Sequence, residues 1–196
     1  MKKRLGIVLS VGGLLLGVYG IYGLLHKGGM PGGPARQDPG QSANAAPGAG
    51  GPASAPLKPA RVPPAGYLEY RNTQYRFALF YPQDLSVKEY DEGSGAMTIS
   101  FQDVATAQGF QIFVEPYGLP QVTQAQFKKD EPSGVMQGAK NTAIDGATAT
   151  SFYSTNPALG DTAEVWFIKG NYLFEVTTLK PLASWLSDIM KTWQFI

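Results

Sequence analysis

The sequence predicts an α+β domain in which an antiparallel sheet is covered by a C-terminal amphipathic helix, and an N-terminal transmembrane helix before it. Two observations predict the domain. Short stretches alternate apolar and polar residues between tight-turn signals, and one closing stretch has helical periodicity. A third observation, 21 residues without a charge from Leu5 to Leu25, predicts the membrane helix.

The first segment, residues 1–25, has the features of an uncleaved signal anchor. A helix as long as its apolar run spans about 31 Å, close to the hydrocarbon thickness of a bilayer. The basic start Met1–Arg4 favours a cytoplasmic N-terminus. No small-residue cleavage site follows directly, and cleavage near Ser42–Ala46 is the main alternative. We therefore expect a single-pass protein of the cell membrane whose C-terminal domain is extracytoplasmic.

Glycines mark one face of this predicted membrane helix, at Gly6, Gly13, Gly17 and Gly20. The spacing of Gly13 and Gly17 is the one that lets two membrane helices approach closely. It predicts packing against a second copy of the chain or another membrane helix. The alternative is that glycine is simply frequent in membrane helices.

The second segment, residues 26–66, is predicted to be a disordered linker. Gly, Pro and Ala occupy 27 of its 41 positions. With so few large apolar side chains it cannot bury enough surface to offset the entropy of ordering. His26, the only histidine of the chain, lies here and is expected to be solvated rather than a ligand.

The third segment, Tyr67–Ile196, is long enough for one hydrophobic core. It carries a net charge of −5, whereas the first 66 residues carry +6. An acidic domain argues against a nucleic-acid partner. The absence of cysteine excludes a disulfide scaffold and thiolate metal sites, and one histidine excludes a cluster of histidine ligands.

Alternating residues predict the first strands of the domain. They cover Tyr75–Tyr81, Leu85–Tyr90, Met97–Phe101 and Phe110–Val114. A short helix is predicted over Thr123–Lys129, and a surface loop over Glu131–Lys140 because of its proline and glycines. Tyr67 and Tyr70 are expected to attach the first strand to the sheet, with a recognition edge as the alternative.

Two turn signals predict the hairpins that follow. Asp145-Gly146 joins Thr142–Asp145 to Ala147–Tyr153, and Gly170-Asn171 joins Ala163–Lys169 to Tyr172–Thr178. The run Val165–Ile168 is apolar on both faces, which indicates a central strand. The apolar positions between Leu182 and Trp193 follow helical spacing and predict the covering helix. If Trp185 belongs to the core, its replacement by alanine should cost about 3–5 kcal/mol.

Several short motifs give the domain a resemblance to PsbP-like domains, named for an extrinsic protein of photosystem II. They are Tyr75-x-Phe77-x-x-x-Tyr81-Pro82, Ile144-x-Gly146-x-x-Ala149, Asn171–Val176 and Ile189-x-x-Thr192-Trp193-Gln194-Phe195. The resemblance implies an α/β/α sandwich with a central antiparallel sheet. It also implies a non-enzymatic role, because this family contains oxygen-evolving-complex subunits, assembly factors and bacterial envelope proteins. It assigns no functional residue.

Catalytic motifs are absent from the sequence: there is no Gly-x-Ser-x-Gly, no Walker loop and no dinucleotide fingerprint. Neighbouring carboxylates remain, and paired acids can hydrolyse glycosides when a cleft holds them about 5–10 Å apart. The candidates are Asp91-Glu92, Asp130-Glu131, and Asp161 with Glu164. Each lies in or beside a polar loop, so solvated charges are expected. Residues 91–94 lack the spacing of a calcium loop. No catalytic residue, metal or cofactor is predicted.

Together these observations predict a membrane-tethered, extracytoplasmic module that binds an envelope protein and has no enzymatic activity. One alternative is a carboxylate-dependent hydrolase of envelope or cell-wall glycans. Another is a carrier with an apolar pocket for a small ligand.

Overall fold

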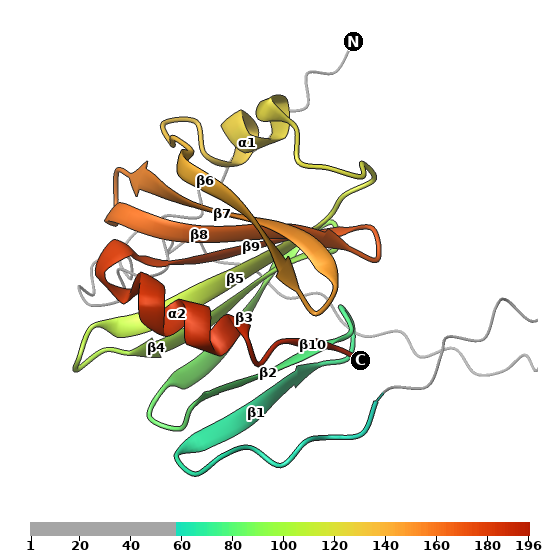
Figure 1. Ribbon diagram of the computed structural model, residues 1–196, viewed down its shortest axis with the longest axis vertical. Coiled ribbons are helices and arrows are strands. Elements are labelled where there is room, and N and C mark those ends of the chain that lie inside the picture. Colours follow the sequence, from blue (N-terminus) through green and yellow to red (C-terminus); the bar gives the residue numbers. More distant parts are fainter. Residues whose placement is uncertain (1–57) are drawn as a thin grey trace, which may run out of the picture. The chain divides into compact units, whose positions relative to one another are not determined.

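The computed structural model describes residues 58–196 (Figure 1). The strands are β1 Tyr67–Asn72, β2 Phe77–Pro82, β3 Ser86–Gly93, β4 Ala96–Asp103, β5 Gln108–Pro116, β6 Gln137–Ile144, β7 Ala147–Asn156, β8 Gly160–Lys169, β9 Tyr172–Leu179 and β10 Gln194–Phe195. The helices are α1 Gln124–Asp130 and α2 Ala183–Met190, with the 3-10 turn η2 Lys180–Leu182 directly before α2.

The strands form two sheets in which every neighbouring pair is antiparallel. The larger sheet has the order β3-β4-β5-β9-β8-β7-β6, and the smaller one has the order β1-β2-β10. β8 lies between β7 and β9, as the apolar run Val165–Ile168 predicted. The antiparallel sheet with a C-terminal helix is therefore confirmed.

Both predicted hairpin turns are present. The central residues of each have positive φ, 41° and 79° at Asp145 and Gly146, and 60° and 65° at Gly170 and Asn171. This backbone conformation matches the right-handed twist of the flanking strands. It favours Gly, Asn and Asp, which explains why the two turns could be read from sequence.

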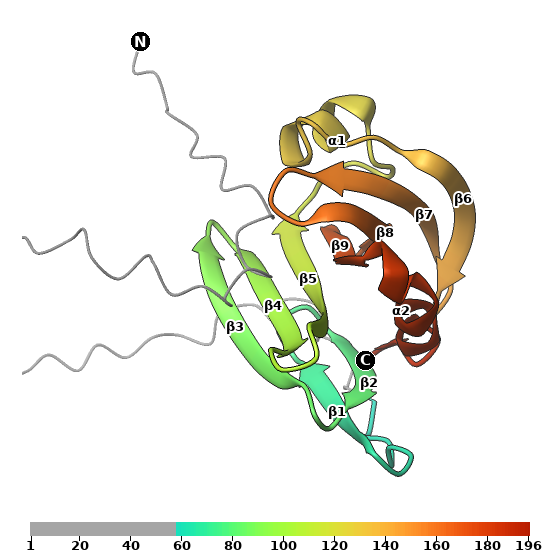
Figure 2. The same ribbon diagram turned by 90° about the vertical axis from the view of Figure 1, so that its left-hand side faces the viewer.

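The main core lies between one face of the large sheet, helix α2 and the small sheet. It contains Leu79 of β2, Phe101 of β4, Phe174 of β9 and Leu186 of α2, which are 0–1% exposed. Figure 2 shows β6, β7 and β8 curving over α2 on this face. Most apolar side chains that alternate along the strands are buried here.

The opposite face of the sheet carries helix α1. Thr123 caps this helix by accepting a hydrogen bond from the backbone N–H of Gln126 at 3.1 Å. Phe127 packs against Phe152 and Trp166, with ring centroids 5.7 and 5.4 Å away. This apolar cluster is small, and the buried residues beside it include the carboxylates Glu131, Glu164 and Glu175.

The C-terminal helix is shorter than predicted. α2 ends at Met190, and Trp193 lies beyond it, in the turn before β10. Thr192 ends the helix, because its hydroxyl donates to the Ile189 carbonyl at 2.7 Å and accepts from the Phe80 amide at 2.8 Å. Its side chain thus bonds the last turn of the helix to β2.

One further prediction is corrected in part, and another is confirmed for Tyr70. The predicted loop Glu131–Lys140 ends in four residues of β6, which begins at Gln137. Tyr70 attaches β1 to the core as expected, with its ring centroid 5.2 Å from that of Phe101. It is therefore a packing residue, and the alternative of a recognition edge is not supported at this position.

Candidate functional site

The glycines predicted to pack membrane helices, Gly6, Gly13, Gly17 and Gly20, lie outside the described residues. The anchor, its orientation and dimerisation through it therefore remain predictions. Within residues 58–196 no helix has the length and apolar character needed to cross a bilayer.

Two of the three predicted carboxylate pairs form no site. Asp91 and Glu92 are exposed beside the β3–β4 turn. Asp161 is exposed and pairs with Lys180 at 3.1 Å, whereas Glu164 is 1% exposed. Three residues along a strand place these two side chains on opposite faces of the sheet. The expectation that Glu164 would be solvated was wrong.

The third pair is also buried, because helix α1 ends on the sheet rather than in solvent. Glu131 is 7% exposed and accepts a hydrogen bond from the Ser154 hydroxyl at 2.6 Å. The Asp130 side chain is likewise 7% exposed. Its carboxylate meets those of Glu115 from β5 and Glu175 from β9, with one oxygen of each residue lying within 4.8 Å of the others.

This cluster of Glu115, Asp130 and Glu175 is contacted by two donors of helix α1. The Lys129 ammonium lies 3.3 Å from Glu115 and 3.4 Å from Asp130. The Gln126 amide nitrogen donates to the same two carboxylates at 2.6 and 2.5 Å. Glu175 is 1% exposed, and its Oε1 has no hydrogen-bond partner within residues 58–196.

Burial governs the protonation of these acids. It raises the pKa of Glu175 well above its usual range, and the neighbouring Asp130 raises it further. The pKa of Glu115 is raised for the same two reasons. On the same face, burial raises the pKa of Glu164 to about 8, although Thr177 donates to its carboxylate at 2.6 Å. Close carboxylates of this kind either share protons or hold a cation.

A groove occupies the other face of the sheet, between α2 and strands β6, β7 and β8. Its volume is about 310 Å³. The apolar part of its wall includes Ala163, Val165, Leu186 and Met190. Polar residues line it along β6 and α2, namely Lys140, Thr142, Ser187 and Lys191.

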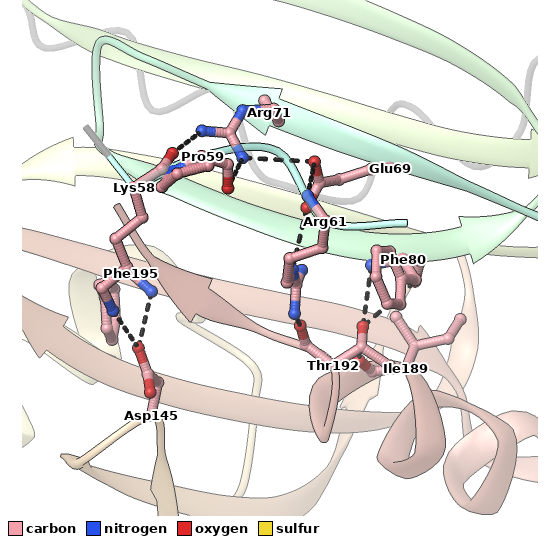
Figure 3. Close-up of polar contacts among 10 residues, drawn as sticks. All are labelled: Lys58, Pro59, Arg61, Glu69, Arg71, Phe80, Asp145, Ile189, Thr192 and Phe195. Carbon is pink, nitrogen blue, oxygen red and sulfur yellow. Dashed lines mark hydrogen bonds and ion pairs between the residues drawn. The ribbon is translucent and has the colours of Figure 1, made fainter. Parts of the chain in front are cut away.

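A third feature is the docked segment Lys58–Arg61, which enters the domain across β1 (Figure 3). The Arg61 guanidinium donates to Glu69 at 2.9 Å and to the Thr192 carbonyl at 2.7 Å. It also lies 4.2 Å from the ring centroid of Phe80, within range of a cation–π contact. This part of the predicted linker therefore contacts the domain.

Arg71 and Asp145 hold the start of the docked segment. Arg71 donates to the carbonyls of Lys58 and Pro59 at 2.5 and 3.3 Å, and also pairs with Glu69. Asp145 lies 3.9 Å from the Lys58 ammonium and accepts the backbone N–H of Phe195 at 2.8 Å. Burial raises the pKa of Glu69, but the hydrogen bonds from the two arginines outweigh it and leave the pKa lowered.

The antiparallel sheet, the order of its strands and the C-terminal helix define a PsbP-like fold. The solution structure of cyanobacterial PsbP (CyanoP) from Synechocystis sp. PCC 6803 is similar to this chain, with a TM-score of 0.50. The sequence identity is 10%, and the alignment covers 71% of this chain and 98% of that chain. No family model and no curated protein matches the chain. The similarity concerns the fold alone.

Sequence reasoning did not identify Glu115, Glu175 or the groove. One signal for Glu175 was available, because an acid interrupts the apolar residues of the strand Tyr172–Leu179. A charged residue in a central strand indicates a buried polar site, since charged side chains are rarely buried without a partner. The meeting of Glu115, Asp130 and Glu175 depends on how β5 pairs with β9, which their spacing in the chain does not show. The groove depends on the curvature of the sheet.

Proposed function

We propose that this chain is a membrane-tethered, extracytoplasmic protein-interaction or assembly module without enzymatic activity. It holds an extended, acid-bearing segment of an envelope protein. One observation carries the proposal: the groove between β6 and α2 combines an apolar wall, two lysines and a strand whose outer edge is unpaired within residues 58–196.

Strand β6 supplies the backbone part of this interaction. It is the last strand of the large sheet, and seven of its eight residues are exposed. Unpaired N–H and C=O groups on a strand edge accept another extended chain, whose alternate side chains then enter adjoining pockets. The groove begins where β6 faces α2, so such a chain could pair with β6 and place apolar side chains against Val165 and Met190.

Charge favours an acidic partner segment. Lys140 of β6 is exposed and has no ion pair among the described residues, and Lys191 after α2 pairs only with the exposed Asp188, at 2.7 Å. The domain as a whole carries excess negative charge. The two lysines would therefore attract an acid-bearing segment to the groove. The negative charge of the rest of the domain would repel other acidic surfaces.

A photo-crosslinking amino acid at Thr142 of the full chain, in its native membranes, tests the proposal. We expect a protein adduct at Thr142 and none at Thr106, which is exposed in the distant β4–β5 turn. Ser187→Trp fills the groove and should abolish the adduct. Ser184→Trp places the same ring on an exposed position of α2 outside the groove and should preserve it. No adduct at Thr142, or one that persists in Ser187→Trp, would reject the proposal.

The volume of the groove also supports a second candidate, a carrier of a small amphipathic ligand. Its 310 Å³ lies at the lower end of the range of small-molecule sites. In that case lipid extracts of the purified full chain should contain a bound small molecule that Ser187→Trp lacks, with no protein adduct at Thr142. The predicted acid pairs do not meet in this groove, so no observation favours the hydrolase.

A further inference from the structure

The pairing of β6 with β7 determines which backbone groups of β6 face outward. Ile144 flanks the two-residue turn to β7 and pairs with the first residue of that strand. Residues on either side of such a turn exchange hydrogen bonds, and every second pair of an antiparallel ladder does the same. Thr142 and Lys140 therefore also bond to β7. The N–H and C=O groups of Asn141 and Ala143 face away from β7, where no strand of residues 58–196 pairs with them.

The β6 side chains that face the groove belong to the residues between these outward backbone groups. Lys140, Thr142 and Ile144 line the groove, and alternate residues of a strand lie on one face of its sheet. A strand added to β6 would place its own alternate side chains directly opposite these three. The groove would therefore contact every second residue of the added strand, and the residues between them would bond to Asn141 and Ala143.

Helix α2 runs beside β6 in the same direction, from the start of the strand to its end. In the 3-10 turn before α2, the Lys180 ammonium lies 5.3 Å from the ring centroid of Tyr153, the cross-strand partner of the first residue of β6. Beyond α2, the Phe195 backbone N–H donates to Asp145, the residue that follows β6. Figures 1 and 2 show the two elements side by side. Lys191, the first residue after α2, therefore lies at the end of the groove next to the β6–β7 turn.

Positive charge marks both ends of this row of groove positions. Lys140 lies on β6 and has no ion pair among the described residues. At the other end, the Lys191 side chain is 72% exposed and pairs with Asp188, which is 69% exposed. Such exposed pairs contribute little to stability, so Lys191 can exchange this partner for another carboxylate. Asp145 in the adjoining turn is itself paired with Lys58, at 3.9 Å.

The middle of the row suits an apolar side chain. Its wall is formed by Thr142 of β6, Ser187 of α2 and the apolar residues Val165, Leu186 and Met190. An aliphatic side chain that enters here exchanges water for apolar surface, which favours binding. A carboxylate at the same position would lose its hydration without gaining a cation.

We propose that the partner segment pairs antiparallel with β6 and carries the pattern acid-x-apolar-x-acid. This inference rests on the proposed function and specifies the partner. The two acids meet Lys140 and Lys191, the apolar side chain enters the groove opposite Thr142, and the x residues bond to the outer edge of β6. The antiparallel direction continues that of the sheet, in which every neighbouring pair is antiparallel, and such ladders are slightly more stable per residue.

Peptide binding to the full chain in detergent micelles tests the pattern. The probe is the capped peptide acetyl-Thr-Glu-Thr-Val-Thr-Glu-Thr-amide, and isothermal titration measures its Kd at low ionic strength. We expect one peptide per chain. Changing both glutamates to glutamine should weaken binding about tenfold, because two ion pairs are lost. Absence of binding by the glutamate peptide, or equal binding of the glutamine peptide, would overturn the inference.

Backbone methylation of the peptide tests the strand pairing. An N-methyl group on either threonine beside the valine replaces an N–H that bonds to β6, and should weaken binding about tenfold. The N–H of the valine faces away from β6 in the antiparallel arrangement, so N-methylation of the valine is the matched control and should leave the Kd unchanged. The reverse pattern of effects would contradict the antiparallel pairing.

Exchange of the charges tests the two lysines. The double variant Lys140→Glu, Lys191→Glu should lose the glutamate peptide and bind the peptide in which both glutamates are lysine. Lys88→Glu, on the opposite edge of the sheet, should bind the glutamate peptide as the parent protein does. If the lysine peptide does not bind the double variant, the assignment of the two acids to Lys140 and Lys191 is wrong.

The adduct at Thr142 separates this inference from the proposed function. Mass spectrometry of the cross-linked peptide identifies the partner segment, which should contain the pattern. An adduct that Ser187→Trp abolishes, on a segment without the pattern, would overturn the inference and leave the proposed function intact. Absence of any adduct at Thr142 would reject the proposed function itself.

Discussion

The indole ring of Trp193 stacks on the phenyl ring of Phe77, with centroids 4.4 Å apart and planes 8° from parallel. The indole also makes edge contacts with Phe167, Phe174 and Phe195, with centroids at 5.1, 5.7 and 6.1 Å. The residue lies beyond the end of α2 and joins β2 to β8 and β9 of the large sheet. The C-terminal segment is thus part of the core rather than an appendage.

Replacement of Trp193 by alanine should therefore lower the free energy of unfolding by about 3–5 kcal/mol. Trp185→Ala is the matched control, because Trp185 is only partly buried and contacts Phe110 edge-on at 5.9 Å. Urea unfolding followed by far-ultraviolet circular dichroism measures the free energy of unfolding of both variants. An equal or larger loss in Trp185→Ala would show that the helix, and not the stacked ring, dominates this part of the core.

The docked segment gives a second prediction. Arg61→Ala removes two side-chain hydrogen bonds, one of them to Glu69, whose side chain is 7% exposed. Glu69 then keeps Arg71 and the backbone N–H of residue 61 as partners. We expect faster hydrogen exchange at residues 58–66 and a loss of stability of about 1–3 kcal/mol. Arg61→Lys keeps the charge but not the forked geometry of the guanidinium. Its stability and its rate of hydrogen exchange should lie between those of the parent protein and of Arg61→Ala.

The Glu69 carboxylate should also respond to Arg61→Ala. Without the Arg61 side chain its pKa should rise toward its usual value, because burial then acts with less opposition. A lowered pKa stabilises the folded state above the unfolded-state value of 4.5, and this contribution disappears as pH falls through the folded pKa. A titration of Glu69 by nuclear magnetic resonance that is the same in both proteins would contradict this role of Arg61.

Glu164 predicts a pH dependence of the opposite sign. Its pKa is about 8 in the folded protein and 4.5 when unfolded, so between these values the folded chain binds a proton that the unfolded chain does not. Its contribution to stability is therefore complete below pH 4.5, decreases as pH rises and is lost above about pH 8. Thermal unfolding in EDTA from pH 4.5 to 8.5 measures it.

Glu164→Gln should flatten this dependence and make the variant increasingly more stable than the parent protein as pH rises. Glu92→Gln removes an exposed carboxylate near the β3–β4 turn and should leave the slope unchanged. If the Gln variant at position 164 keeps the full slope, another buried acid is responsible for it, with Glu175 the first to test.

Charge reversal tests the proposed acidic partner of the groove. Lys140→Glu should reduce the adduct formed at Thr142 several-fold, with the largest effect at low ionic strength. Lys88→Glu makes the same change on β3, the opposite edge of the sheet, and should leave the adduct unchanged. A reduction by both variants would point to net charge rather than to recognition in the groove.

Much of the fold could be predicted because its signals are local. The Asp145-Gly146 and Gly170-Asn171 turns depend on positive φ, and Thr123 marks the start of α1 by its capping side chain. The end of α2 could not be predicted in the same way. Its helical periodicity continues to Trp193, but contacts of Thr192 with β2, more than a hundred residues away, end the helix earlier.

The candidate sites were harder to predict for the same reason. Asp130 was singled out, but as a solvated charge, since its neighbours in the chain are polar. Its burial follows from where α1 rests on the sheet, and its partners Glu115 and Glu175 lie on two other elements. The groove likewise arises from strands that bend over a helix formed later in the chain.

The clamp formed by Arg61, Arg71 and Asp145 has a mechanical consequence. Tension transmitted from the N-terminal side of the chain reaches the domain first at residues 58–61, which are bonded both to β1 and to the Thr192 turn. These bonds must break before the load reaches the hydrogen bonds between β1 and β2. Asp145 lies in the β6–β7 turn and Thr192 directly follows Lys191, so the clamp joins the N-terminal side of the domain to elements that line the groove. Tension on residues 58–61 would therefore act on the groove before it reaches the pairing of β1 with β2.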